Sequence, residues 1–155
     1  MAGWTNKGKY RAMGVFCRAE GDTQFTNGFY VALCTSATSP TADINTMSEL
    51  TEIAAGNGYT SGGVLTTRSS AGFDVWTEDD GNDRCYVQLI DIVWTASGGN
   101  IPASGNGARW AVMIDKNGTI GSREVFIYWD LTSDRTISSG QTLTLQNCEI
   151  RLNET

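Results

Sequence analysis

The acidic side chains are the groups of this sequence best able to do chemistry, because the sequence has 17 Asp and Glu residues and no histidine. Two carboxyl groups that face each other about 5–9.5 Å apart across a cleft can hydrolyse a glycosidic bond. Asp91 and Asp130 interrupt otherwise apolar stretches, so they are the acids to inspect for such a pair. Exposure at a strand edge, or an ion pair with Arg84 or Arg109, is the more ordinary explanation of both.

Other catalytic patterns are missing from the sequence. Without histidine, a Ser-His-Asp triad, a Cys-His pair and most zinc enzymes cannot be assembled. The glycine patterns that cradle nucleotide phosphates and the Gly-x-Ser-x-Gly elbow of acyl-transfer enzymes are also absent. We therefore assign no catalytic residue and no cofactor, and we expect a protein that is not an enzyme.

The densest group of oxygen ligands is the run Glu78–Asp83, with the sequence EDDGND. Calcium favours such oxygens, but the run lacks the alternating acids and the terminal Glu of an EF-hand loop. Asp, Asn and Gly are also the residues that turns require. We interpret the run as a solvated turn and assign no metal site.

The four cysteines are too far apart for a Cys-x-x-Cys metal clip. We expect small hydrophobic side chains that stay reduced in the cytoplasm, with disulfides an option only if the protein leaves the cell. The cysteines are Cys17, Cys34, Cys85 and Cys148.

An N-terminal group of large side chains is the candidate protein interface. Trp4 lies in a segment that has little within its own chain to pack against, and an exposed Trp near a terminus is typical of an interface anchor. We therefore predict an interface formed by Trp4, Tyr10 and Met13 within a helix or arm that spans residues 1–19. The spacing of apolar residues favours an amphipathic helix over Asn6–Ala19, which would cover one face of the first strand.

A platform for a host glycan is the alternative binding site. It requires an exposed aromatic pair, such as Trp76 or Trp110, beside the long loop Ser97–Ala108. For the other Trp and Tyr residues, burial in the core is the default interpretation.

Strand patterns dominate the chain from residue 28 onward. Arg84–Ala96 alternates over its whole length and is predicted to be one central strand. The last pattern changes phase, and a β-bulge near Gln146 or Asn147 would restore a single core-facing side. The predicted strands are Gly28–Cys34, Val64–Thr67, Phe73–Thr77, Arg84–Ala96, Arg109–Lys116, Glu124–Leu131 and Thr142–Leu152.

Three local patterns connect these strands. Thr46 and Glu49 form a capping-box sequence, which predicts a short helix with Met47, Leu50 and Ile53 on one face. The glycine-rich segment 56–63 predicts a surface crossover. The Asn-Gly pair at residues 117–118 predicts a hairpin between two strands.

The chain is predicted to be one mainly β domain over residues 1–155. The architecture is an antiparallel two-sheet sandwich or jelly roll with a short N-terminal helix and one small additional helix. One core is expected for this length. Its predicted members include Val31, Leu89, Trp110, Val112, Ile127, Trp129 and Leu145.

The net charge of −6 has the wrong sign for gripping a phosphate backbone. No apolar run reaches the roughly 18–20 residues that span a bilayer, and the first residues lack the apolar stretch of a signal peptide. We expect no nucleic-acid partner, no membrane association and synthesis in the cytoplasm.

The order of several segments resembles small structural proteins of tailed-bacteriophage particles, of the minor structural, decoration or tail-fibre-like kinds. The segments are FYVALCTSA, GNGYTSGG, WTA, ARWAVMID, EVFIYWDL and ISSGQTLTLQNCEIRL. The resemblance covers nearly the whole chain and brings no catalytic residue. It implies a virion component, assembled in the host cytoplasm, that contacts the major capsid protein or neck and tail proteins and forms a homo-oligomer. A capsid decoration or cement protein is the first expectation; a neck, tail or fibre component and a host-glycan-binding module are the alternatives.

Overall fold

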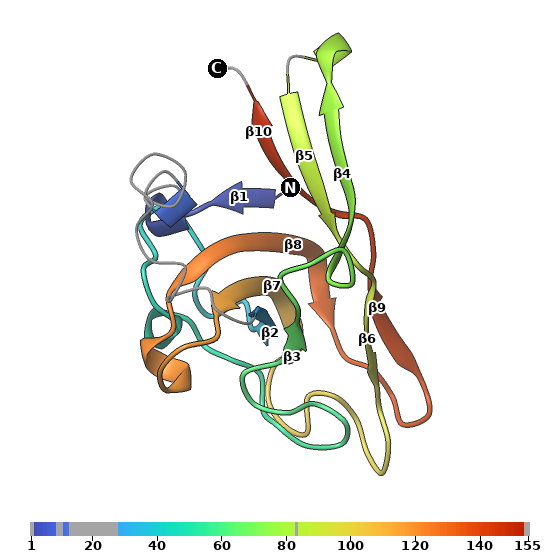
Figure 1. Ribbon diagram of the computed structural model, residues 1–155. Helices are drawn as coiled ribbons and strands as arrows, with labels where there is room; N and C mark the ends of the chain where they lie inside the picture. The colour runs from blue at the N-terminus through green and yellow to red at the C-terminus, as the bar shows by residue number, and fades with distance from the viewer. Residues whose placement is uncertain (1, 9–10, 13–27, 83, 154–155) are drawn as a thin grey trace.

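A five-stranded antiparallel β-sheet packs as a sandwich against a second layer, which consists of a three-stranded and a two-stranded sheet, in a computed structural model of the chain (Figure 1). The structure describes residues 2–8, 11–12, 28–82 and 84–153. The fold is therefore mainly β, as the strand patterns predicted. Of the predicted N-terminal helix, residues 6–8 and 11–12 are described and helical.

The first sheet has five strands in the order β1-β8-β7-β2-β3. The strands are β1 (Ala2–Trp4), β8 (Val125–Arg135), β7 (Ala108–Asp115), β2 (Phe29–Cys34) and β3 (Val64–Thr66).

The second layer has a three-stranded part in the order β10-β5-β4 and a two-stranded part that pairs β6 with β9. These strands are β10 (Cys148–Asn153), β5 (Arg84–Leu89), β4 (Phe73–Asp79), β6 (Ile92–Thr95) and β9 (Thr142–Leu145). Three short 3-10 helices complete the described elements: η2 (Met47–Glu49), η3 (Asp80–Asn82) and η4 (Ile120–Ser122).

The sandwich core lies between the two layers. The first sheet contributes Val31, Leu33 and Met113, and the second contributes Leu89, Trp94 and Leu145. A second apolar cluster lies on the other face of the first sheet, around Ala32, Val112 and Ile114. The expectation of a single core is therefore wrong in detail, because β2 and β7 are buried on both faces.

The predicted core residues divide between these two clusters. Val31, Leu89, Ile127, Trp129 and Leu145 belong to the sandwich core. Val112 belongs to the second cluster, and Trp110 is only half-buried at its margin. Trp110 meets the Tyr128 ring edge to face at a centroid distance of 6.2 Å, so it packs against the second cluster without being fully buried.

The predicted central strand Arg84–Ala96 is two strands, because the chain bends at Ile90 and Asp91. The opposite strand bends at the same level, where Asn147 has a positive φ of 53°. Core-facing side chains lie on both sides of this point, as predicted, but the irregularity is a break between β9 and β10 instead of a β-bulge within one strand. Strands β5–β6 and β9–β10 form one long ribbon with matched bends, and Figure 1 shows its β5–β10 half rising past the first sheet.

The segment around η2 covers the second face of β2. Ile44, Met47 and Leu50 pack there against Ala32 and Cys34. The capping box is present, since the Glu49 carboxylate accepts hydrogen bonds from the Thr46 and Asn45 N–H groups. The helix is shorter than predicted, and Ile53 belongs to the sandwich core instead of sharing a face with Met47.

The glycine-rich crossover, which was predicted to lie on the surface, and the long loop Ser97–Ala108 are both anchored in the core. In the glycine-rich crossover, Tyr59 is buried; its hydroxyl donates to Glu52 Oε1 at 2.7 Å and accepts from the Leu33 N–H at 3.0 Å. In the loop Ser97–Ala108, Ile101 is fully buried and exchanges two backbone hydrogen bonds with Ile137. A single apolar side chain fixes each loop.

Strands β7 and β8 form the predicted hairpin, with η4 in its connection. A register shift between Met113 and Ile114 changes the face that β8 presents. As a result Val125 packs in the second cluster while Ile127 and Trp129 face the sandwich core, although the sequence pattern put all three on one side.

Candidate functional site

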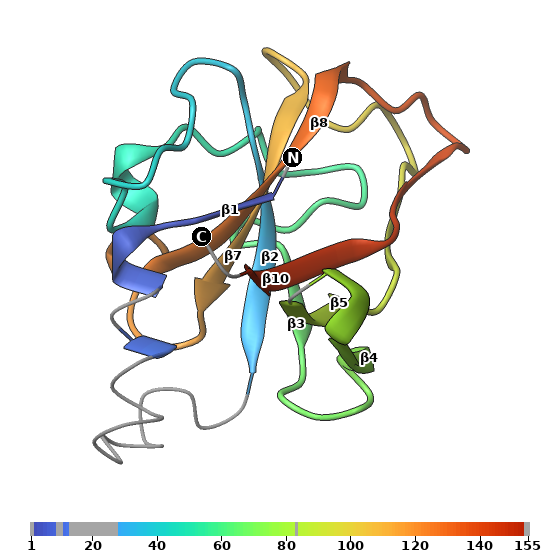
Figure 2. The same cartoon turned by 90° about the horizontal axis from the view of Figure 1, so that it is seen from above.

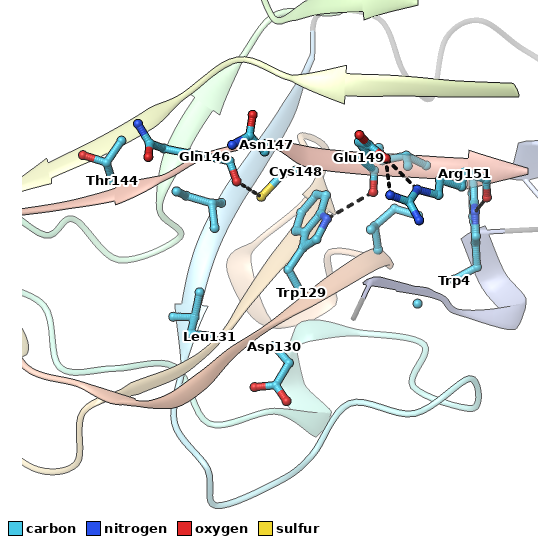
Figure 3. Close-up of a pocket in the computed structure, with 14 residues that line it drawn as sticks. Trp4, Trp129, Asp130, Leu131, Thr144, Gln146, Asn147, Cys148, Glu149 and Arg151 are labelled. Carbon is cyan, nitrogen blue, oxygen red and sulfur yellow. Dashed lines mark hydrogen bonds and ion pairs between the residues drawn. The ribbon is translucent and has the colours of Figure 1, made fainter. Parts of the chain in front are cut away.

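A groove of about 840 Å³ runs along the open side of the sandwich, between β8 with β1 on one wall and β9 with β10 on the other (Figure 3). The polar and aromatic side chains of its lining are Trp4, Trp129, Asp130, Thr144, Gln146, Asn147, Glu149 and Arg151. This lining is more polar than that of typical small-molecule sites, which are mostly apolar with a few polar groups.

Two tryptophans of the groove connect the first sheet to β10. The Trp4 indole N–H donates to the Arg151 carbonyl at 3.0 Å, and the Trp129 indole N–H donates to the Glu149 carbonyl at 3.4 Å. Both carbonyls belong to β10, which is one of the two edge strands of its sheet. The indoles therefore satisfy acceptors at a sheet edge and tie the two layers together.

The groove offers little surface for stacking a ligand. Trp129 is only 6% exposed, because its ring lies between β8 and β10 as in Figure 3. Asp130 points away from β10 and is held by Arg109 through two hydrogen bonds of 2.9 and 3.0 Å. Arg109 and the Thr132 N–H hold the pKa of Asp130 below its usual range. The ion pair named as the ordinary explanation of this acid is thus present.

The second acid named for catalysis has an ordinary partner too. Asp91 accepts a hydrogen bond from Gln146 Nε2 at 3.2 Å, at the bend of the ribbon. Glu149, which lines the groove, pairs instead with Arg151. Asp91, Asp130 and Glu149 each form a hydrogen bond or an ion pair with another side chain of the domain.

The structure changes the argument for Trp4 as an interface residue. Trp4 ends β1, which pairs with β8, and its ring packs against the sandwich core. The premise that this residue has little within its own chain to contact is therefore wrong. Tyr10 and Met13, the other predicted interface residues, lie outside the described residues.

A different tryptophan is exposed. Trp76 on β4 has 89% of its surface accessible. Trp76 lies directly across from Val87 on β5, which in turn lies across from Ile150 on β10. Along this row Ile150 is buried, Val87 is half-buried and Trp76 is exposed. The row two residues further along the strands, toward the β4–β5 turn, consists of Leu152, Cys85 and Glu78, and all three are exposed.

The three-stranded part of the second layer therefore extends past the core by at least one row of side chains. Figure 1 shows β4, β5 and the end of β10 standing above the first sheet, and Figure 2 shows the same strands beside it from above. We call the far end of this sheet, with Trp76, Glu78, Cys85 and Leu152, the projecting arm. The predicted bulge would put Leu152 on the core-facing side with Ile150; Leu152 shares that face but is 57% exposed.

The acidic run at the tip of the arm is a turn. Residues Asp80–Asn82 form η3, which leads from β4 to β5. Asp79 accepts from Arg84 at 2.7 Å and from the Asn82 amide, and these partners lower the pKa of Asp79. Across the part of the chain that the structure describes, no three His, Cys, Asp or Glu side chains are grouped so that they could hold a metal ion.

The cysteines differ in environment. Cys34 and Cys148 are buried free thiols, and burial raises the pKa of each to about 12. Cys85 is an exposed free thiol on the arm. Cys17 lies outside the described residues. The expectation of small buried hydrophobes is confirmed for Cys34 and Cys148 and wrong for Cys85.

The proposed aromatic platform beside the loop Ser97–Ala108 is not assembled. Strand β4, which carries Trp76, lies at the opposite end of the molecule from that loop in Figure 1. Trp110 adjoins the loop in sequence but packs against Tyr128, with the Arg109 guanidinium 5.5 Å from its ring centre. Sequence reasoning named Trp76 but had no signal for the edge on which it stands.

Comparisons with known proteins add no relative: no family model, no curated protein and no solved structure matches the chain. Within residues 2–8, 11–12, 28–82 and 84–153, no helix has the length and apolar character needed to cross a bilayer.

Proposed function

We propose that this protein is a structural, non-catalytic component of a tailed-bacteriophage particle, and specifically a decoration or cement protein bound in many copies to the capsid. The resemblance of its segments to small virion proteins supports the class. The observation that carries the proposal is the projecting arm, because an exposed Trp and an exposed Leu on one sheet face are typical of a surface that a partner covers.

A subunit that attaches in many copies needs only modest affinity at each site. The arm suits such attachment, since it presents apolar side chains without drawing on the sandwich core for them. The net charge of −6 keeps free copies apart before assembly.

The test of this proposal is the number of copies per particle. Mass spectrometry of purified particles, with this chain counted against the major capsid protein, is expected to give a ratio near that of a surface lattice. A few copies per particle would place the protein in the neck, tail or fibre instead. Absence from purified particles would overturn the proposal.

A host-glycan-binding module is the second candidate, and it rests on the same exposed ring. A Trp side chain with 89% of its surface free can stack on a sugar. A glycan array with the wild-type protein and the Trp76→Ala variant separates the two functions, because only a glycan module retains binding that depends on this ring in the absence of other particle proteins.

A further inference from the structure

We propose that the free edge of β4 binds an extended, basic segment of a partner protein, which adds to the sheet as a further strand beside Trp76. This inference deepens the proposed function, on which it rests for the identity of the partner as a neighbouring particle protein. The binding chemistry itself is argued below from β4 alone.

The first observation is that β4 is an open edge. The strand order of its sheet is β10-β5-β4, so β5 pairs with one side of β4 and no described strand pairs with the other. Open edges carry backbone N–H and C=O groups that can pair with an added strand. Main-chain pairing of this kind gives affinity, while the side chains at alternate positions give specificity.

The second observation is the face on which Trp76 stands. Cross-strand pairing places Trp76 in the same row as Val87 and Ile150, with Leu152 and Cys85 in the next row. An added strand beside β4 would continue these rows and cover one side of the Trp76 ring. A sheet edge that only needed to be kept free of partners would gain nothing from a large apolar ring there.

The third observation is the charge around this ring. Asp74 and Glu78, two residues to either side of Trp76, are exposed, and no described residue forms an ion pair with either. Arg84 engages the neighbouring Asp79. A strand that places an apolar residue beside Trp76 therefore gains most from Lys or Arg two residues away, because opposite charges paired across strands are stabilising.

The same charges disfavour a second copy of this chain as the occupant. An antiparallel copy of β4 centred on Trp76 would bring Asp74, at the β-bulge between Phe73 and Val75, close to Glu78 of the second copy, twice over. Like charges directly opposite each other destabilise a strand pair. The edge is thus selective, because its charges disfavour a second copy of β4 and favour a basic strand.

The experiment uses purified full-length protein and a defined probe. The probe is a short threonine-rich peptide with a central Val and a Lys two residues to each side; the matched peptide has Ser in place of each Lys. NMR titration of backbone amides and hydrogen exchange report binding. We expect shifts and slowed exchange along β4, with affinity for the Lys peptide about tenfold or more above that for the Ser peptide and falling as salt is raised.

Three variants sharpen the test. Trp76→Ala and the double variant Asp74→Lys with Glu78→Lys are each expected to lose about tenfold or more in affinity for the Lys peptide. Val93→Ala is the matched control, because Val93 is an exposed apolar residue on β6, at 52% accessibility, outside the arm. All four positions are exposed, so melting temperatures should stay unchanged.

Other outcomes overturn the inference. These are no binding of the Lys peptide, equal binding of the two peptides, shifts away from β4, or sedimentation that shows self-association through β4. None of them bears on the copy number in particles, so a failure at this edge is distinguishable from a failure of the proposed function.

Discussion

The two ends of the second layer have similar alternating sequences but differ in how far their side chains are buried. In the β6–β9 half, Ile92 and Trp94 alternate with exposed residues and are buried against the first sheet. In the half that pairs β5 with β4 and β10, Trp76 also stands in an alternating strand and is almost fully exposed. Alternation specifies that a strand has two faces; whether a face is covered depends on how far the opposite sheet reaches.

The bend between the halves is what separates them. At Ile90–Asp91 and at Gln146–Asn147 both strands of the ribbon leave regular pairing, and the set of core-facing positions changes phase. Below the bend the ribbon follows the first sheet; beyond it the strands leave the core within a few residues. This division predicts which changes affect folding and which affect only binding.

The largest expected effect comes from a matched pair of tryptophan substitutions. Trp94→Ala should lower the free energy of unfolding by about 3–5 kcal/mol, because the ring is buried and its removal leaves a cavity. Trp76→Ala should change it by less than about 0.5 kcal/mol, as for exposed sites in general. Urea denaturation of both variants measures the difference. A loss above about 1 kcal/mol for Trp76→Ala would show that the arm packs on something within its own chain.

The second prediction concerns the bend. Asn147 has φ of 53°, a left-handed conformation that β-branched residues avoid. Asn147→Val should therefore lower the free energy of unfolding by about 1–2 kcal/mol, whereas Asn147→Gly should be close to neutral. If both variants were equally destabilised, the side chain of Asn147 rather than its backbone conformation would be what the bend requires.

These effects also show what the sequence could and could not predict. Most strands from residue 28 onward, the capping box at Thr46 and the irregularity at Asn147 follow from local patterns, and the structure confirms them. Strand β1, in the segment predicted as an N-terminal helix or arm, was not predicted. The break at Asp91 was missed because the alternating pattern continues through it. The exposure of Trp76 depends on which strands become neighbours, and so does the hydrogen bond from the Trp4 indole to the Arg151 carbonyl, which we call the Trp4 clasp. No local pattern carries that information.

The third prediction concerns pH and the sandwich half of the comparison. Burial, and then the nearby charge of Glu124, raises the pKa of Asp115 to about 6, against the opposing effects of Arg123 and Arg11. The folded protein therefore holds a proton that the unfolded chain releases at lower pH, so the contribution of Asp115 to stability is fully present below about pH 4 and is lost as the pH rises to about 6.

Asp115→Asn should abolish this fall and raise the free energy of unfolding at pH 7 by about 1 kcal/mol, with solvent screening of a half-buried group taken into account. Thermal melts at pH 4, 5, 6 and 7 measure both. A fall that persists in Asp115→Asn would assign it to another group.

The smallest expected effect tests how the arm's base is joined to the first sheet. Trp4→Phe keeps an aromatic ring against the core but removes the indole N–H that donates to the Arg151 carbonyl. The loss should be about 0.5–1.5 kcal/mol, the usual net contribution of one hydrogen bond. Amide exchange should then accelerate in β10 near Arg151 and stay unchanged in β6, because the clasp joins β1 only to the upper half of the ribbon.

The same residue remains the predicted interface anchor, and Trp4→Phe separates the two roles. If Trp4 serves only as the clasp, particles that carry Trp4→Phe should retain full occupancy at a temperature well below its melting point. An interface that depends on the indole ring would lose occupancy in Trp4→Ala by far more than in Trp4→Phe, after correction for stability. Equal occupancy of all three proteins would place attachment elsewhere, and the exposed face of Trp76 would then be the surface to examine by the same substitution.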